Sequence, residues 1–132
     1  YNVATKEIDY SDDDHPSKGY HQKSHGESFL AIAQDYMGAD GVYIFDEPEA
    51  ALSPQRQLTL LINIYRCAQE GAQFIIVSHS PILLGMPDAE IFSFDNGTLH
   101  PCQYEDTDSY VITKTFVNNR QHFLNQLLNE ET

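Results

Sequence analysis

The sequence predicts an α/β fold with parallel strands, flanking helices and a small β-hairpin. Two short apolar runs, VYIF at 42–45 and FIIV at 74–77, enclose a segment with helical periodicity. Strand, helix and strand in this order is typical of two parallel strands joined by a crossover helix. Nearer the C-terminus, Asn96 and Gly97 stand between two further strand-like runs, and an Asn-Gly pair in that position indicates an antiparallel hairpin.

Length and composition limit the class of protein. A chain of 132 residues with 41% hydrophobic residues holds about one domain with a modest core. No apolar run approaches the ~18 residues that a membrane span requires, and the N-terminus does not resemble a signal peptide. We therefore expect a cytoplasmic protein without a membrane partner. Cys67 and Cys102 lie far apart, which favours reduced thiols over a disulfide framework or a zinc site.

The charge of the chain bears on its partners. The formal net charge is −13, and only seven Lys and Arg residues are present, without a cluster. A surface this acidic repels phosphate backbones and lacks the basic footprint of a nucleic-acid reader. Nucleic acid is therefore not supported as a partner of this chain, although a domain outside the sequence could supply a positive surface.

The N-terminal part is expected to change from loop to helix. Residues 1–23 show no sustained hydrophobic period and contain an Asp triplet with Pro and Gly, which predicts a flexible loop. Ser24 and Glu27 have the spacing of an S-x-x-E capping box, and apolar residues then recur at helical spacing until Gly38. The sequence thus predicts a helix over 24–37.

The two apolar runs and the segment between them form the predicted βαβ unit. Both runs are continuously apolar, as expected of strands buried on both faces. Between them, Ser53 followed by Pro54 is typical of a helix N-cap and first position, and Gly71 closes the helical pattern. After the second run, Ser80 and Pro81 could open another helix in the same way.

The C-terminal part, 96–132, is expected to complete the hairpin and then to form helices. Residues 108–130 carry apolar side chains at helical spacing, in one or two pieces. Asn118 and Asn119 are the weak point of this pattern.

Three polar side chains follow the predicted parallel strands: Asp46, Glu47 and His79. Polar residues just past the carboxyl ends of parallel strands line the ligand crevice of α/β folds. A rigidly held carboxylate such as Asp46 suits a hydrated Mg²⁺ that carries phosphate oxygens, Glu47 could polarise an attacking water, and His79 could contact the same phosphate. Taken singly, each of these residues is adequately explained as a solvated turn or a polar cap.

Four motifs occur in order: SHGES at 24–28, VYIFDE at 42–47, AALSP at 50–54 and IIVSHS at 75–80. Together they resemble the C-terminal portion of an ABC-type P-loop ATPase, with a signature segment, Walker B plus catalytic glutamate, D-loop and switch histidine. The resemblance covers roughly residues 22–95, with the motifs in 24–95. It is closer to the soluble AAA/ABC-like ATPases related to SMC and RecF than to transporter subunits.

This resemblance implies ATP and Mg²⁺ as cofactors and a homodimer that closes over the nucleotide. Asp46 would coordinate the metal, Glu47 would act as general base, and His79 would sense the γ-phosphate. The signature residues would meet the partner's γ-phosphate at a helix N-terminus, and the D-loop would cross the dimer interface. The signature residues are Ser24, Gly26 and Glu27, and the D-loop residues are Ala50, Ala51, Leu52 and Ser53.

The chain also departs from the family pattern. Lys23, His25 and Ser53 stand where a leucine, a glycine and an aspartate are usual. No G-x-x-x-x-G-K-[ST] loop occurs, so the resemblance implies a C-terminal fragment whose Walker A half is a partner, and ATP hydrolysis is not expected from this chain alone. In the related fold the FIIV strand adjoins the P-loop strand, so without that strand one sheet edge would be bare.

Two alternatives from other functional classes remain open. The chain could be a nucleotide-independent interaction module, which the missing P-loop favours. Alternatively, the acidic run Asp12–Asp14 with His15, His21 and His25 could bind a divalent metal, since imidazoles and carboxylates gathered on one loop can do so.

Overall fold

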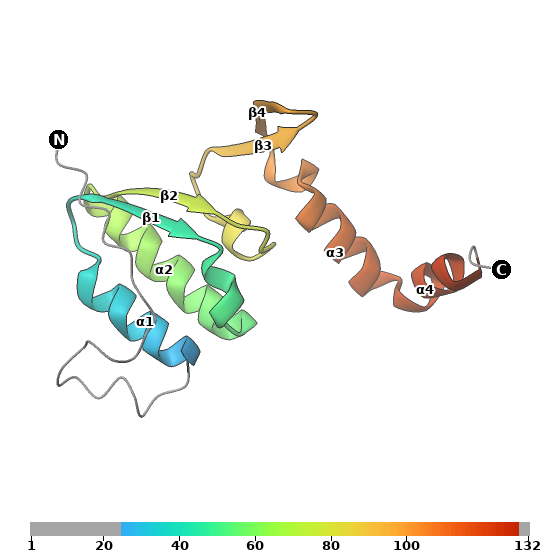
Figure 1. The fold of residues 1–132 in the computed structure, drawn as a ribbon, viewed down its shortest axis with the longest axis horizontal. Coiled ribbons are helices and arrows are strands. Elements are labelled where there is room, and N and C mark those ends of the chain that lie inside the picture. The colour runs from blue at the N-terminus through green and yellow to red at the C-terminus, as the bar shows by residue number, and fades with distance from the viewer. Residues whose placement is uncertain (1–24, 130–132) are drawn as a thin grey trace. The chain divides into compact units, whose positions relative to one another are not determined.

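A computed structural model describes residues 25–129 of the chain (Figure 1). The chain divides after Pro87 into two compact units, rather than the one unit that its length predicts. We call them the N-terminal unit and the C-terminal unit and describe each by itself. The flexible loop predicted for residues 1–23 lies outside the described residues. So does Ser24 of the predicted capping box, and the side chain of its Glu27 is not described.

The N-terminal unit is a mixed α/β layer. Its strands pair in parallel, with Val42 opposite Gln73 and Asp46 opposite Val77, as the sequence predicts. Both helices lie on the same side of the two strands (Figure 1). In chain order the elements are α1 (His25–Tyr36), β1 (Val42–Asp46), the 3-10 turn η2 (Pro48–Ala51), α2 (Pro54–Glu70), β2 (Gln73–Val77) and the 3-10 turn η3 (Leu83–Gly85).

The core lies between the inner face of the sheet and the two helices. Its aromatic centre is a chain of ring contacts in which Phe29 meets Phe45 at 6.2 Å between centroids and Phe45 meets Phe74 at 6.1 Å. Tyr43 stacks on Phe74 at 5.1 Å and ties the preceding loop, because its hydroxyl donates to the Asp40 carbonyl oxygen. The aliphatic part of the core comes from Leu30, Ala33, Leu52, Leu60, Leu61, Ile64 and Leu83.

The outer face of the sheet is exposed, so the prediction of strands buried on both faces is wrong. Val42, Ile44, Ile75 and Val77 are 49%, 54%, 58% and 52% exposed. Side chains alternate across a strand, and in the described chain α1 and α2 cover only the inner set. The continuous apolar run reflects the strand preference of β-branched residues as well as burial.

The predicted boundaries of α2 are confirmed. Ser53 is the N-cap, with its hydroxyl oxygen accepting a hydrogen bond from the Arg56 N–H at 3.3 Å, and Pro54 occupies the first turn. Gly71 ends the helix at φ 125°, a value that favours glycine, and a Cβ there would lie 3.1 Å from the Ala39 carbonyl oxygen.

The helix that Ser80 and Pro81 could have opened is reduced to the single turn η3. Ser80 does act as a cap, since its hydroxyl oxygen accepts from the N–H groups of Ile82 and Leu83, each at 3.1 Å. The turn ends at Gly85, and Met86 leaves it at φ −55° and ψ 125°.

The C-terminal unit begins with the predicted hairpin. Strands β3 (Ile91–Asp95) and β4 (Thr98–Cys102) pair antiparallel. Asn96 and Gly97 join them with φ values of 53° and 75°, and a two-residue turn of type I′ requires a positive φ at both positions. The Asn-Gly signal is therefore confirmed.

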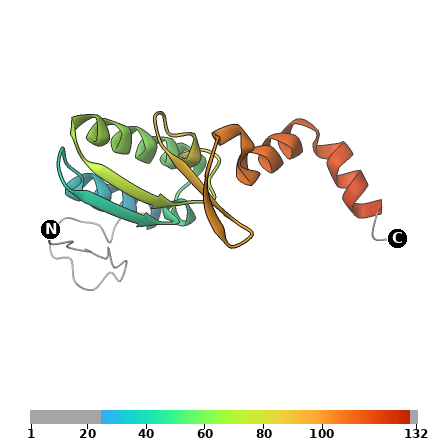
Figure 2. The same cartoon turned by 90° about the horizontal axis from the view of Figure 1, so that it is seen from above.

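The rest of the C-terminal unit is helical. The turn η4 (Tyr104–Asp106) leads into α3 (Asp108–Asn118), and α4 (Arg120–Asn129) follows after a break at Asn119 (Figure 2, orange and red). The predicted weak point at Asn118 and Asn119 is thus where the helix divides. Of the helices in the described chain, none is long and apolar enough to span a bilayer.

Leu60 and Leu58 on α2 offer a matched test of the packing. Leu60 is fully buried, whereas Leu58 is 52% exposed on the same helix. Leu60→Ala should lower the free energy of unfolding by about 2–5 kcal/mol, because it leaves a cavity between α2 and the sheet. Leu58→Ala should change it by about 1 kcal/mol or less. Urea unfolding followed by circular dichroism measures both, and equal losses would contradict the described core.

Candidate functional site

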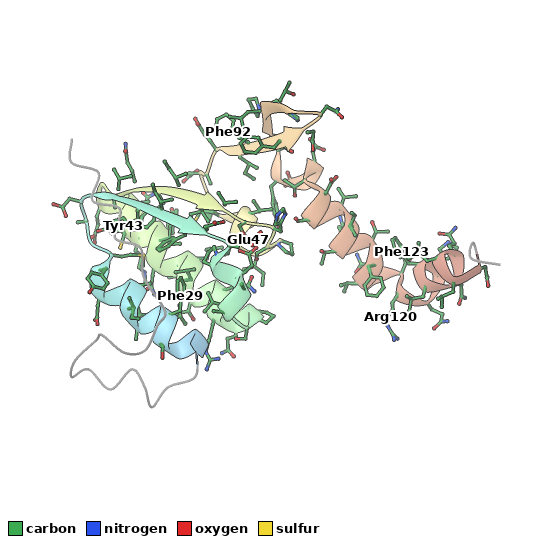
Figure 3. The ribbon with its side chains drawn as sticks, viewed as in Figure 1. Phe29, Tyr43, Glu47, Phe92, Arg120 and Phe123 are labelled. Atoms are coloured by element: carbon green, nitrogen blue, oxygen red, sulfur yellow. The ribbon has the colours of Figure 1, made fainter. Side chains whose placement is uncertain are left out.

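The site is built at the carboxyl edge of the parallel sheet. Strand β1 ends at Asp46, and Glu47 follows it directly beyond the strand's C-terminal end (Figure 3). Strand β2 ends at Val77, two residues before His79. The Glu47 N–H donates to the Val77 carbonyl oxygen at 2.7 Å, which continues the hydrogen bonding of the strands by one residue. Parallel pairing therefore brings the two strand ends, and the residues that follow them, to one edge.

Glu47 and His79 meet at this edge. The His79 Nε2 lies 3.5 Å from the Glu47 Oε1, and the two side chains are 80% and 54% exposed. The contact is an ion pair when the imidazole is protonated. Such an exposed pair contributes at most about 1 kcal/mol to stability, so other interactions must hold the two residues where they are.

Asp46 points away from the core. Strand alternation puts its side chain on the outer face with Ile44, while Phe45 is buried, and Asp46 is exposed to solvent. The two acids thus leave the strand end in different directions. The structure places Asp46, Glu47 and His79 at one edge, and the roles predicted for them stay predictions.

The backbone of Glu47 is in the left-handed region, at φ 47° and ψ 55°. This conformation costs a non-glycine residue about 1–2 kcal/mol. It is imposed from both sides: the Glu47 N–H is bonded to β2, and its carbonyl oxygen accepts from the Ala50 N–H at 3.2 Å in η2. Pro48, buried directly after it, further disfavours the right-handed helical conformation at Glu47.

The predicted D-loop residues have distinct local environments. Ala50 and Ala51 lie in η2, Leu52 is extended and buried in the core, and Ser53 is the exposed N-cap of α2. Of the predicted signature residues, Gly26 and Glu27 fall in the first turn of α1. Ser24 lies outside the described residues and the Glu27 side chain is not described, so the role predicted for the signature residues at the partner's nucleotide stays a prediction.

Glu49 is a site residue that the sequence did not reveal. Its Oε1 accepts from the Ser78 hydroxyl at 2.9 Å, and its Oε2 accepts from the His79 N–H at 2.7 Å. These bonds join the turn after β1 to the loop after β2. The one available signal was that parallel strands place these two loops together, so that an acid in one faces hydroxyl and N–H donors in the other.

Ser80 and Gln57 form a second polar connection that the sequence did not reveal. Ser80 is 4% exposed, and its hydroxyl donates a short hydrogen bond to the Gln57 Oε1. The Gln57 Nε2 in turn donates to the Leu52 carbonyl oxygen at 3.1 Å. The loop after β2 is thereby fastened to α2 and, through it, to the end of the predicted D-loop.

The acids suit a magnesium ion better than a metal held by protein ligands alone. In the described chain no three His, Cys, Asp or Glu side chains gather as a metal site. Mg²⁺ commonly takes one or two carboxylates, with waters and substrate phosphates completing its coordination, and the exposed carboxylate of Asp46 fits that pattern. The alternative metal loop of Asp12–Asp14, His15 and His21 lies outside the described residues, as does the side chain of His25.

Comparison with known proteins gives one family. The family described as "AAA domain, putative AbiEii toxin, Type IV TA system" matches residues 9–85. This match spans the N-terminal unit's strands, α1, α2 and every residue of the carboxyl edge. No curated protein and no solved structure matches the chain.

The left-handed backbone at position 47 can be tested by two substitutions. Glu47→Gly should be more stable than Glu47→Ala by about 1 kcal/mol, because glycine adopts a positive φ without a Cβ clash. At Asp46, which is extended, the order should reverse, with Asp46→Gly less stable than Asp46→Ala. Urea unfolding of the four variants gives both comparisons. An alanine variant as stable as the glycine variant at position 47 would contradict the geometry.

Ser80 should be important for stability. Ser80→Ala leaves the Gln57 Oε1 and the Ile82 and Leu83 N–H groups without their hydroxyl partner, and should lower the free energy of unfolding by about 1–3 kcal/mol. Thr59→Ala is the control, because its exposed hydroxyl donates to the Gln55 carbonyl oxygen within α2. Thermal or urea unfolding compares them. A Ser80 variant no less stable than the control would show that the network is not formed.

Proposed function

The chain belongs to the AAA-domain family that matches residues 9–85, and from this premise we propose that it supplies the Walker B side of a composite ATP-hydrolysing site. Membership of this family indicates an ATPase-related, nucleotide-binding function. The finer proposal is an ABC-type ATPase domain with a P-loop NTPase fold, in which Asp46 and Glu47 form the end of Walker B and His79 is the switch histidine.

One observation carries the proposal: the 3.5 Å approach of His79 and Glu47 beside Asp46 at the carboxyl edge. Ligands of α/β sheets bind outside the carboxyl ends of the strands. A base, a hydrogen-bonding imidazole and a metal-binding carboxylate together at that edge are the groups that phosphoryl transfer to water needs. The family match independently supports an ATPase-related, nucleotide-binding function.

Each side chain has a distinct proposed role. Asp46 presents the oxygens that would hold Mg²⁺, and Glu47 presents the oxygens that would orient a water. Bound there, the metal supplies positive charge to the phosphate oxygens. The Glu47 carboxylate accepts a hydrogen bond from the attacking water, which orients it, and takes the proton that the water loses. His79 lies within reach of Glu47 and contacts a phosphate oxygen, and both side chains are exposed enough to meet a substrate.

The phosphate-binding loop comes from elsewhere in this proposal. No G-x-x-x-x-G-K-[ST] occurs in the sequence, and β2 pairs with β1 alone in the described chain, which leaves it an edge to accept a neighbouring strand. The partner is then the Walker A half of the ATPase. In the cytoplasmic homodimer that we propose, Ser24, Gly26 and Glu27 act on the partner's nucleotide, and Ala50–Ser53 cross the interface.

A nucleotide-independent interaction module is the second candidate. The exposed apolar face of β1 and β2 favours it, since a contiguous apolar patch marks a surface suited to association. This candidate requires none of the chemistry of Asp46, Glu47 and His79. The two candidates therefore differ in whether changes at these residues affect turnover.

The test is Mg²⁺-dependent ATP hydrolysis by this chain combined with the segment that precedes it in its gene. Glu47→Gln should lower turnover by at least ~100-fold, because the amide cannot accept the proton of the water. Glu70→Gln is the control: it makes the same change at an exposed position in the last turn of α2 and should leave turnover unchanged.

Two outcomes would contradict the proposal. In the first, the two pieces associate without hydrolysing ATP, which favours the interaction module. In the second, ATP is hydrolysed and Glu47→Gln has no more effect than Glu70→Gln, which excludes Glu47 as the general base.

A further inference from the structure

Glu49 joins the two loops of the site through a single carboxylate. It lies in η2, two residues after Glu47, and its two oxygens bond to residues 29 and 30 positions further along the chain. One partner is the Ser78 hydroxyl, and the other is the backbone N–H of His79 itself. The residue that we propose to sense phosphate is thus held by its own main chain to the turn that presents Glu47.

The bonds to Glu49 are of a strong kind. An N–H donor 2.7 Å from a carboxylate oxygen is a charge-assisted hydrogen bond, roughly twice as strong as one between neutral groups, and the one from His79 lies at a solvent-exposed position. The bond from Ser78 is partly buried, so water competes with it less than at a fully exposed site. Because both oxygens are engaged, the carboxylate fixes the orientation of the loop as well as its distance.

The direct contact between His79 and Glu47 cannot fix the distance and orientation of the two loops. Both side chains are largely in water, and the closest atoms are 3.5 Å apart. Solvent weakens such a pair, and long side chains lose entropy when they are held in one geometry. The approach of the imidazole to Glu47 is therefore a result of how the two backbones are held, and the Glu49 carboxylate supplies side-chain hydrogen bonds that join the two loops directly.

Ser78 extends this connection into the protein interior. The Ser78 hydroxyl donates a hydrogen bond to the Glu49 Oε1, and its oxygen accepts one from the Ser80 N–H at 3.0 Å. Ser80 is buried and caps η3, whose residue Leu83 belongs to the core. The polar chain from Glu49 through Ser78 to Ser80 thus anchors an exposed loop to a buried turn.

We propose that Glu49 is the positioning residue of this site, which holds the loop of His79 against the turn of Glu47 so that the two functional side chains face each other. It acts through them and does not itself touch substrate. This inference rests on the proposed function for its catalytic consequence, since a displacement of about 1 Å between reacting groups can slow turnover by ~10²-fold. The positioning itself is a property of the chain with or without nucleotide.

The positioning is tested by NMR on the chain alone. In the wild type the His79 amide proton, bonded to a carboxylate, should resonate far downfield, and the His79 ring should show a nuclear Overhauser effect to the Glu47 side chain. Glu49→Ala should move that amide upfield and abolish the ring contact. Glu70→Ala, the same change at an exposed glutamate outside the site, should alter neither signal. Unfolding curves show whether each variant is folded.

A conservative variant separates positioning from loss of fold. Glu49→Gln keeps one acceptor oxygen and replaces the other with a donor, so it can still accept from the His79 N–H while its bond with Ser78 reverses. The amide shift and the ring contact should be partly restored in comparison with Glu49→Ala. Unchanged His79 signals in a folded Glu49→Ala variant would overturn the inference, whether or not the combined pieces hydrolyse ATP.

The catalytic consequence is measured in the combined ATPase. Glu49→Ala should lower kcat by about 10²-fold with KM changed less than about threefold, because nucleotide binding does not use this carboxylate. An unchanged kcat together with displaced His79 signals would overturn the catalytic half of the inference. If the wild-type mixture hydrolyses no ATP, the proposed function fails, and the NMR experiment still decides whether Glu49 positions the loop.

Discussion

The parallel pairing of β1 with β2 is the constraint on which the rest of the site depends. Once Asp46 stands opposite Val77, the turn after one strand and the loop after the other emerge at the same edge. The crossover helix α2 follows from the same choice, since parallel strands cannot be joined by a tight turn. This pairing therefore determines where three further features lie: the left-handed backbone of Glu47, the hydrogen bonds of Glu49 and the cap at Ser80.

The sequence predicted the features that are decided within a few residues. Ser53 with Pro54 starts α2, Asn96 with Gly97 turns the hairpin, and the helix breaks at Asn119, because caps and turns depend on local hydrogen bonds and local backbone freedom. The order of strands and crossover helix was also readable from apolar periodicity. The relationship to AAA-domain proteins was predicted from short segments that lie at the ends of these local elements.

Features that depend on distant partners were beyond the sequence. The apolar runs of β1 and β2 could not show that only one face is covered, because burial depends on what packs there. Ser80 followed by Pro81 has the composition of a helix start, yet the chain makes a single 3-10 turn. Glu49 accepts its hydrogen bonds from residues that only the folded sheet brings near, and nothing in its immediate neighbours distinguishes it from a solvated acid.

The exposed outer face of the sheet has a consequence for the behaviour of this chain in solution. Four β-branched side chains, Val42, Ile44, Ile75 and Val77, offer an apolar surface, while the net charge of −13 makes copies of the chain repel one another. That repulsion reaches only about 10 Å at 0.1 M ionic strength and about 3 Å at 1 M. Colloidal stability is therefore set by salt: at low ionic strength charge keeps the molecules apart, and at high ionic strength the apolar faces are free to meet.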